Sequence, residues 1–193
     1  RDFSINAIYS DKDGNLFDPH NGKKDLENGS VKFIGNADER IQEDYLRILR
    51  YLRFFLNYSL NKHEPEIYKT IKRNIGGISK LSSERLIDEL KKLTKSSGFI
   101  RLFKDKESLE LIEIIFPQLK NLQILKKINS YTQKNLSKVD FTYLISLFII
   151  SGTDNADYFL YKFQISTKNP KSIKIINDFY NTKVTIKNYT YKE

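Results

Sequence analysis

The chain has 193 residues, of which 39% are hydrophobic and 13% aromatic, so it is long enough and apolar enough to bury a substantial core. Its formal net charge is +9, a balance that favours a polyanionic partner such as RNA through phosphate contacts. A lysine-, isoleucine- and asparagine-rich sequence is also typical of an AT-rich genome. Charge alone therefore leaves a nucleic-acid surface and a merely solvated surface both open.

The sequence contains no cysteine, which excludes disulfides, thiolate metal sites and a cysteine nucleophile. Its two histidines, His20 and His63, are too few for a histidine-based metal cluster. No apolar run reaches the ~18 residues of a membrane-spanning helix, and no secretory signal opens the chain. We therefore expect a cytoplasmic protein. Because the chain opens with Arg1 and contains no methionine, we also expect it to be a fragment or processed piece.

The first part of the sequence predicts a small β structure. Residues 1–7 have helical spacing, and residues 8–17 place an Asp-Gly turn between two short apolar runs, as in a β-hairpin. Asp18-Pro19 ends the second strand, because proline cannot donate to a strand ladder. We expect a loop over residues 20–29 and one more short strand over residues 31–34.

From Asp38 onward the apolar spacing changes to three and four residues, which predicts helices. The predicted segments are residues 41–56, 64–75, 83–95, 109–115 and 140–150, with Ser82 or Ser83 as the N-cap of the third. Pro117 and the turn at residues 152–154 mark breaks, and residues 182–193 alternate too loosely to classify. The predicted fold class is mainly α, with a small β-hairpin remnant leading into an all-helical body.

One segment, residues 43–54, combines carboxylates and arginines at helical spacing. In a continuous helix Glu43 and Asp44 lie four and three residues before Arg47, so they share one face with it. Such groups are often ordinary surface ion pairs worth ~0.3–0.5 kcal/mol. Three arginines nevertheless fall at positions 47, 50 and 53 in a chain with 25 lysines and eight arginines. Planar guanidinium forks suit bases and phosphates.

A fixed carboxylate beside a fixed guanidinium can imitate a pairing base. Asp44 only accepts hydrogen bonds and suits the exocyclic amino group of cytosine or adenine, whereas Arg47 only donates and suits the adjacent ring nitrogen. Uracil and guanine would turn a carbonyl oxygen toward the carboxylate, and each unpaired polar group costs ~1–3 kcal/mol. The pair is therefore predicted to select C and A over U and G.

Four motifs in order resemble those of the bacterial-type (class II) CCA-adding tRNA nucleotidyltransferase and poly(A) polymerase family. The motifs are Arg1 to Ala7; Asp18-Pro19 with Gly22 and Asp25-Leu26; Glu43-Asp44 with Leu46-Arg47 and Leu49-Arg50; and Glu84 to Leu90. Each is weak or moderate alone, and together they cover residues 1 to about 95. Ser4 stands where the family usually has threonine, and Lys23-Lys24 follow Gly22, but neither position is a predicted ligand contact.

The resemblance implies roles for individual residues. The first motif would recognise the sugar and triphosphate of the incoming nucleotide, with Asp2 and Asn6 on one helical face hydrogen-bonding the ribose and Arg1 meeting phosphate. The second motif would form a hinge at Asp18, Gly22 and Asp25, and the last would buttress the helix of Asp44 and Arg47. The predicted nucleotide-binding residues are Arg1, Asp2, Asn6, Asp44, Arg47, Arg50 and Arg53.

The resemblance also implies a division of the chain. Residues 1–36 would be the C-terminal part of a nucleotidyltransferase head, residues 37–95 a nucleotide-selecting and RNA-binding neck, and residues 96–193 a tRNA-binding body and tail. Candidate RNA-binding residues are Lys91, Lys92, Lys126, Lys127 and Lys134, each of which is equally well explained as a solvated surface lysine.

The implied activity is addition of CCA to tRNA 3′ ends from CTP and ATP, with Mg²⁺ as the metal. The family's phosphate loop and metal-binding Asp-x-Asp pair would lie before residue 1, so we predict no catalytic or metal-binding residue here and no polymerising activity of this chain alone. A poly(A) polymerase of the same family would carry the same motifs. A non-catalytic helical RNA-binding module that keeps the motifs as a scaffold is a further alternative.

Overall fold

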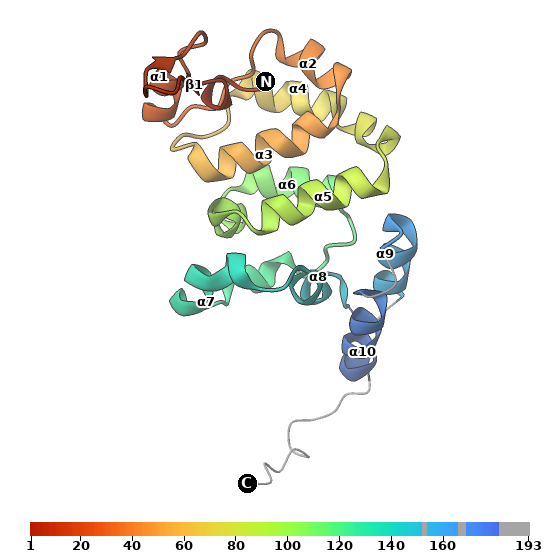
Figure 1. Cartoon of the computed structure of the whole chain (residues 1–193). Coiled ribbons are helices and arrows are strands. Elements are labelled where there is room, and N and C mark those ends of the chain that lie inside the picture. The colour runs from red at the N-terminus through yellow and green to blue at the C-terminus, as the bar shows by residue number, and fades with distance from the viewer. Residues whose placement is uncertain (152–153, 166–168, 182–193) are drawn as a thin grey trace. The chain divides into compact units, whose positions relative to one another are not determined.

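The computed structural model describes residues 1–151, 154–165 and 169–181 (Figure 1). The chain forms two compact units, residues 1–115 and residues 116–193, which are described separately. The predicted fold class is confirmed, because the described residues form mostly helices together with one two-stranded antiparallel sheet. Within these residues no helix has both the length and the apolar character needed to cross a membrane.

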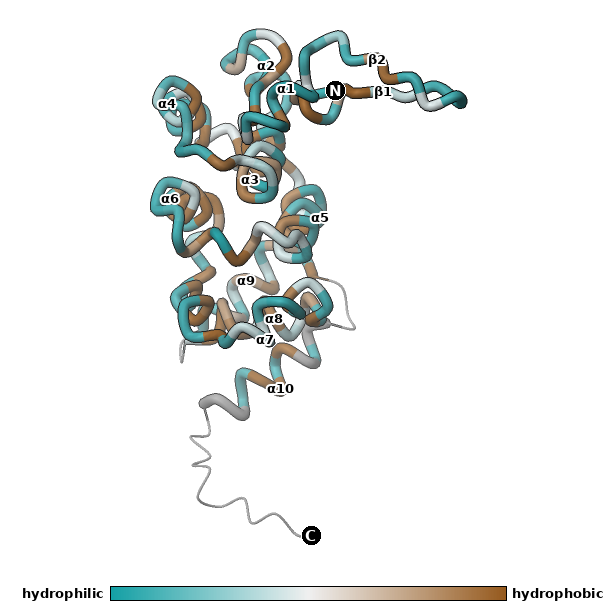
Figure 2. The backbone as a smooth tube through the Cα atoms, turned by 90° about the vertical axis from the view of Figure 1, so that its left-hand side faces the viewer, coloured by the Kyte–Doolittle hydropathy of each residue, from teal (hydrophilic) through white to brown (hydrophobic). Residues whose placement is uncertain are grey.

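The first unit opens with the 3₁₀ turn η1 (Ser4–Asn6) and the predicted hairpin of β1 (Tyr9–Ser10) and β2 (Leu16–Phe17). Tyr9 lies opposite Phe17 in an antiparallel register, and the turn contains Gly14 at φ +87°, a backbone conformation that favours glycine. The hairpin projects from the helices of its unit (Figure 2).

Three predictions for this region were wrong. Residues 1–7 are helical only over η1, because Phe3 instead forms an isolated antiparallel bridge with Phe33. That bridge also replaces the predicted strand over residues 31–34. The predicted loop over residues 20–29 contains the short helix α1 (Gly22–Glu27), which starts after Asn21 in the left-handed conformation.

The remainder of the first unit is helical, as predicted. Its helices are α2 (Ala37–Glu43), α3 (Leu46–Tyr58), α4 (Pro65–Asn74), α5 (Ser83–Thr94) and α6 (Lys106–Ile115), with the 3₁₀ segments η2 (Ile75–Lys80) and η3 (Ser97–Phe103). Ser82 is the N-cap of α5, and its side chain accepts a hydrogen bond from the Arg85 backbone N–H. The predicted continuous helix over residues 41–56 is instead two helices, because Asp44 adopts an extended conformation (φ −155°, ψ 102°) between α2 and α3.

Helix α3 lies at the centre of this unit, packed against α5, η3 and α2 (Figure 1). Its apolar positions recur every three or four residues, and Ile48, Leu49, Leu52 and Leu56 are almost fully buried. The ring of Tyr51 stacks on Phe33 with centroids 5.7 Å apart, and Phe33 in turn packs against Phe3 at 4.9 Å. This aromatic cluster fixes the N-terminal segment against α3.

The second unit contains η4 (Leu122–Lys126), α7 (Ser130–Asn135), η5 (Leu136–Lys138), α8 (Phe141–Ile149), α9 (Asn155–Phe163) and α10 (Asn169–Asn181). Helix α8, which was predicted, is capped by Asp140, whose carboxylate accepts from the Thr142 N–H at 2.8 Å. Its buried face, including Phe148, packs with buried side chains of α9 and α10. Residues 152 and 153 of the predicted turn lie outside the described residues. The unclassified residues 182–193 also lie outside them.

Candidate functional site

The candidate site is centred on Asp2, which is only 5% exposed. Its carboxylate contacts three arginines of α2 and α3. Arg47 Nε donates to Asp2 Oδ1 at 2.8 Å, and Arg50 Nη1 forms an ion pair with Oδ2 at 2.8 Å. Arg40 Nη2 lies 3.7 Å from Oδ1. A buried carboxylate is tolerated only with such partners, so the N-terminal segment and the arginines hold one another in place.

This arrangement corrects the predicted geometry of the first motif. Asp2 precedes η1 instead of sharing a helical face with Asn6, and Asn6 uses its Oδ1 to accept from the Phe3 backbone N–H at 3.2 Å. Arg1 is exposed, and its carbonyl oxygen accepts from Arg40 Nη2 at 3.1 Å. Asp2 therefore positions arginines, whereas the Arg1 side chain stays at the surface.

Arg47 makes the predicted pair with Glu43, with 2.6 Å between Nη1 and Oε2. The same Nη1 also donates to the carbonyl oxygen of Arg40 at 2.5 Å. Burial opposes the charge of Arg47, but the hydrogen bond with Glu43 and the nearby Asp2 carboxylate outweigh it and raise the pKa of the guanidinium. The hydrogen bond from Arg47, with help from Arg40, lowers the pKa of Glu43. Arg47 is thus held as a fixed cation.

Asp44 does not share a helical face with Arg47, contrary to the prediction. Because α2 ends before Asp44 and Arg47 lies in the first turn of α3, the two side chains have separate partners. Both carboxylate oxygens of Asp44 accept from Arg85 Nη2, at 2.8 and 3.0 Å. Oδ1 also accepts from the Leu46 backbone N–H at 3.2 Å. The side chains of Asp44 and Arg47 remain 25% and 14% exposed, so both reach the surface.

The other two arginines of the motif differ in their environment. Arg50 is about one-third exposed, whereas Arg53 donates from Nε to Oε1 of Glu89 at 2.6 Å and lies over the Phe54 ring. Glu89 belongs to α5 and is 2% exposed. Arg53 therefore joins α3 to α5 in a largely buried pair, and Arg50 is the more accessible of the two.

Two arginines that were not predicted to belong to the site hold the charged groups of the site. Arg40 contacts Asp2 and Glu43, and Arg85 fixes the carboxylate of Asp44. Arg85 belongs to the last motif, and it forms a direct ion pair with Asp44, a residue predicted to select the nucleotide. Arginine is scarce in this sequence, with eight arginines against 25 lysines, so each arginine could have been considered as a candidate site residue.

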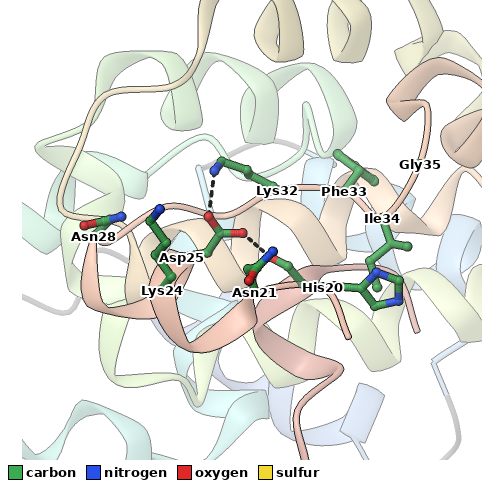
Figure 3. A pocket seen from close by; sticks show the side chains of 10 residues that line it. His20, Asn21, Lys24, Asp25, Asn28, Lys32, Phe33, Ile34 and Gly35 are labelled. Carbon is green, nitrogen blue, oxygen red and sulfur yellow. Dashed lines mark hydrogen bonds and ion pairs between the residues drawn. The ribbon is translucent and has the colours of Figure 1, made fainter. Parts of the chain in front are cut away.

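The predicted hinge residues fasten α1 to the start of the chain. Asp18 accepts from the backbone N–H groups of Lys23 and Gly22, at 2.9 and 2.7 Å, and the first of these bonds is the main cause of its lowered pKa. Gly22 packs so closely that an added Cβ would lie 2.2 Å from the Ser4 carbonyl oxygen. Asp25 is buried and accepts from Ser4 Oγ at 2.7 Å and from Lys32 Nζ at 2.6 Å (Figure 3).

Asp25 lines a polar cavity of about 420 Å³, and Figure 3 shows His20, Lys24 and Lys32 along the same cavity. The carboxylate of Asp25 is already paired with Lys32, and this hydrogen bond raises the pKa of Lys32. These contacts hold α1 against the segment at Lys32 without contact to Asp44 or Arg47.

The predicted RNA-binding lysines fall in both units. Lys91 and Lys92 lie on α5 within reach of Asp88 and Glu89, with N–O distances of 3.7 and 3.6 Å. Lys126, Lys127 and Lys134 are exposed in the second unit. Two of the five lysines therefore belong to the first unit and three to the second.

Comparison with known proteins places these features in a family. Residues 1–32 match the model described as poly A polymerase head domain, and residues 62–123 match the probable RNA and SrmB- binding site of polymerase A. The CCA-adding enzyme of Staphylococcus saprophyticus is 31% identical over 176 residues, covering 91% of this chain and 42% of that protein. The mitochondrial CCA tRNA nucleotidyltransferase 1 of Homo sapiens is 47% identical over 95 residues, covering 48% of this chain and 22% of that protein.

The fold agrees with these matches. The crystal structure of the Bacillus stearothermophilus CCA-adding enzyme in complex with CTP aligns with a TM-score of 0.67 and 22% identity, covering 94% of this chain and 46% of that one. The chain belongs to the CCA-adding tRNA nucleotidyltransferase and poly(A) polymerase family, as its motifs predicted. It spans less than half the length of these relatives.

Proposed function

We propose that the chain is part of a template-independent nucleotidyltransferase that adds CCA to tRNA 3′ ends, and that this segment selects CTP and ATP and binds RNA. The relatives that align over nine-tenths of the chain are CCA-adding enzymes. The observation that carries the proposal is the pair of fixed, opposite charges at Asp44 and Arg47, each held by its own partners and each partly exposed.

Both side chains keep hydrogen-bonding capacity for a nucleobase. The Asp44 carboxylate has lone pairs beyond those that face Arg85 and Leu46, and it can accept from the amino group of cytosine or adenine. Arg47 Nη2 has no hydrogen-bond partner among the described residues, so it is available to donate to a ring nitrogen. The same pair presents an unfavourable acceptor to the carbonyl groups of uracil and guanine.

The remaining nucleotide contacts are proposed from the exposure of the side chains and from their chemistry. Arg1 and Arg50 are accessible guanidiniums that suit the triphosphate, and Asn6 suits the ribose. Asp2 acts through the arginines that it holds, and Arg53 through its pair with Glu89. In this proposal residues 1–36 complete a nucleotidyltransferase head, residues 37–95 select the nucleotide, and residues 96–193 bind tRNA, with Asp18, Gly22 and Asp25 at the hinge.

The metal, the second nucleotide and the location are part of the same proposal. Two-metal phosphoryl transfer requires carboxylates that align the attacking 3′ hydroxyl and the leaving pyrophosphate. We assign Mg²⁺ to carboxylates outside this chain, and we assign CTP and ATP to the segment containing Asp44 and Arg47. We place the activity in the cytoplasm.

The complete protein tests the proposal directly. It is incubated with a tRNA that lacks its 3′ terminus and with each of the four nucleoside triphosphates, singly and together, with Mg²⁺ or with EDTA. The expected product with CTP and ATP gains three nucleotides and then stops, and EDTA abolishes it. Incorporation of UTP or GTP at comparable rates contradicts the proposed selection.

A poly(A) polymerase is the second candidate, favoured by the match of residues 1–32 to a poly A polymerase head domain. In the same assay it would extend RNA with many adenylates and would not require CTP. A non-catalytic RNA-binding module would bind the tRNA and add nothing. The three functions therefore give three different products.

A further inference from the structure

The positive charge is distributed unevenly along the chain. Residues 116–193 contain twelve lysines, no arginine and five acidic residues, whereas residues 1–115 contain 21 basic and 19 acidic residues. The second unit therefore carries most of the net charge of +9. A surface of this kind attracts polyanions without selecting a sequence.

The second unit also contains a cavity of about 480 Å³, a volume in the usual range of small-molecule sites. Four of its lining residues are aliphatic and come from η4, the end of α8 and α10: Ile124, Leu147, Ile150 and Ile176. Its remaining lining residues are polar: Lys120, Asn121, Gln123, Lys127 and Ser146. The site is distinct from the one built around Asp44 and Arg47, which lies in the first unit.

Two of the polar lining residues are already committed within the fold. The Asn121 side-chain amide donates to the Ile150 carbonyl oxygen, and Ser146 Oγ donates to the Tyr143 carbonyl oxygen at 2.7 Å. Gln123, by contrast, is exposed and makes no side-chain hydrogen bond within the described residues. The cavity thus offers one free amide group, which can both donate and accept.

The charged residues that line the cavity are both lysines, and no acidic residue among the described lining residues balances them. Lys120 and Lys127 are exposed, make no ion pair within the described residues, and no acidic residue lines the cavity. A ligand that fits this lining has a flat or apolar body with hydrogen-bonding edges and carries a negative charge at one end. A nucleotide has this chemistry, since its base could contact the aliphatic lining residues, its base edge Gln123 and its phosphate the lysines.

We propose that this cavity holds one unpaired nucleotide of a bound RNA, with Lys120 and Lys127 at its phosphate. The inference rests on the proposed function, because that function supplies the RNA. It adds a second recognition point, one that distinguishes an unstacked base from a paired one at a place separate from nucleotide selection. Sequence-tolerant contact with an exposed base is a common mode of RNA recognition.

The test uses the purified protein and a short single-stranded RNA with 2-aminopurine at its centre, compared with the same sequence in a blunt duplex. Fluorescence of 2-aminopurine rises when the base leaves its stacked neighbours, so the wild type should increase it on binding the single strand. Binding constants for both RNAs are measured at one salt concentration. The readout is the ratio of the two affinities, which a general loss of charge leaves unchanged.

Neighbouring lysines provide matched variants, since Lys126 and Lys127 are both exposed and only Lys127 lines the cavity. Lys127→Glu and Lys120→Glu should each lower the preference for the single strand at least fivefold. Lys126→Glu should weaken both RNAs alike and keep their ratio within twofold. Ile124→Asn should abolish the fluorescence increase, and an abasic site in place of 2-aminopurine should remove the preference in the wild type.

The outcomes separate this inference from the proposed function. If Lys126→Glu and Lys127→Glu change the affinity ratio equally, or if the abasic RNA keeps the full preference, the cavity is not a nucleotide site although the protein binds RNA. If the wild type binds neither RNA, the proposed RNA partner fails and the cavity proposal fails with it.

Discussion

At the scale of single residues, the charged groups of the candidate site are held by partners that leave part of each group free. Arg85 binds both oxygens of Asp44, while Asp2 and Glu43 hold Arg47. The side chains need no rearrangement to present an acceptor and a donor, which is the basis of preorganised recognition. In the proposed function, nucleotide selection would therefore depend on one carboxylate, that of Asp44.

Substitution Asp44→Ala in the complete protein should relax nucleotide choice. Loss of the acceptor removes the penalty on uracil and guanine, so discrimination of CTP from UTP should fall by roughly tenfold or more, in line with ~1–3 kcal/mol for an unpaired polar group. The measurement is kcat/KM for each nucleotide together with the Kd for tRNA, which should change little. Glu39→Ala is the control, because Glu39 is an exposed carboxylate of the adjacent α2. Unchanged selection in the Asp44 variant would remove the central role assigned to this residue.

Asp105 predicts a pH dependence of stability. Burial opposes its charge, but hydrogen bonds from His63 and from Ser108 outweigh it and lower its pKa from 3.8 to about 2. Because the folded pKa lies below the unfolded one, the stabilisation is fully present above about pH 4 and is lost as the pH falls toward 2. Asp105→Asn should lower the urea midpoint at pH 7 and narrow its difference from the wild type near pH 3. Glu113→Gln, an exposed change on helix α6, which begins directly after Asp105, should leave both midpoints unchanged.

At the scale of the elements, local pattern predicted most helices but not the break that shapes the site. Helices α4, α5 and α8 follow from apolar spacing and caps, because their core faces repeat regularly. The break at Asp44 was hidden, since the apolar period continues across it and the contact that stabilises it, from Arg85, lies 41 residues away. Helix α1 was missed because it begins at a left-handed Asn21 and is held by Asp18 and by contacts with Ser4. Contacts between residues far apart in the sequence, namely Arg85 with Asp44 and Ser4 with Asp25, therefore contribute to both differences from the prediction.

The packing of η2 on Tyr45 gives a prediction with a neighbouring control. A Cβ on Gly77 would lie 2.1 Å from the Tyr45 ring, whereas one on Gly76 would meet nothing within 4 Å. Gly77→Ala should destabilise the protein by ~1–3 kcal/mol through overpacking and should weaken C and A selection, because Tyr45 follows Asp44 in the chain. Gly76→Ala should be neutral or slightly stabilising. Thermal melting and kcat/KM measure the two effects, and equal melting temperatures for both variants would contradict the close contact.

The pair between Arg53 and Glu89 tests how α3 is coupled to α5. Among the described residues, Arg53→Ala leaves the buried Glu89 carboxylate with Lys92, at 3.6 Å, as its remaining ion-pair partner, and should cost ~3 kcal/mol of unfolding free energy. Glu89→Gln in the same background should recover much of that loss, because the uncompensated charge is gone. Chemical denaturation of the single and double variants measures the coupling. Additive losses would show that the pair contributes no coupling energy.

At the scale of the whole molecule, the uneven charge leads us to expect that any non-specific RNA binding comes mainly from residues 116–193. Lys134 and Lys138 are exposed there and make no ion pair within the described residues, whereas Lys91 and Lys92 lie close to Asp88 and Glu89. Each lysine that neutralises a phosphate contributes about 0.9 to the slope of log K against log salt for duplex DNA and about 0.7 for a single strand, and we expect a value of this order for tRNA. The double variant Lys134→Ala and Lys138→Ala should therefore reduce the slope by about 2.

The double variant Lys91→Ala and Lys92→Ala is the matched comparison and should reduce the slope by less than 1, because the partner carboxylates already offset those charges. Binding of tRNA is measured from 50 to 200 mM salt, a range in which the expected difference is large. The opposite order of the two slopes would assign the main electrostatic surface to α5, which contacts through Arg85 the segment proposed to select the nucleotide. Residues 37–95 would then both select the nucleotide and hold the RNA. The proposed division, in which the lysine-rich residues 116–193 hold the RNA, would be wrong.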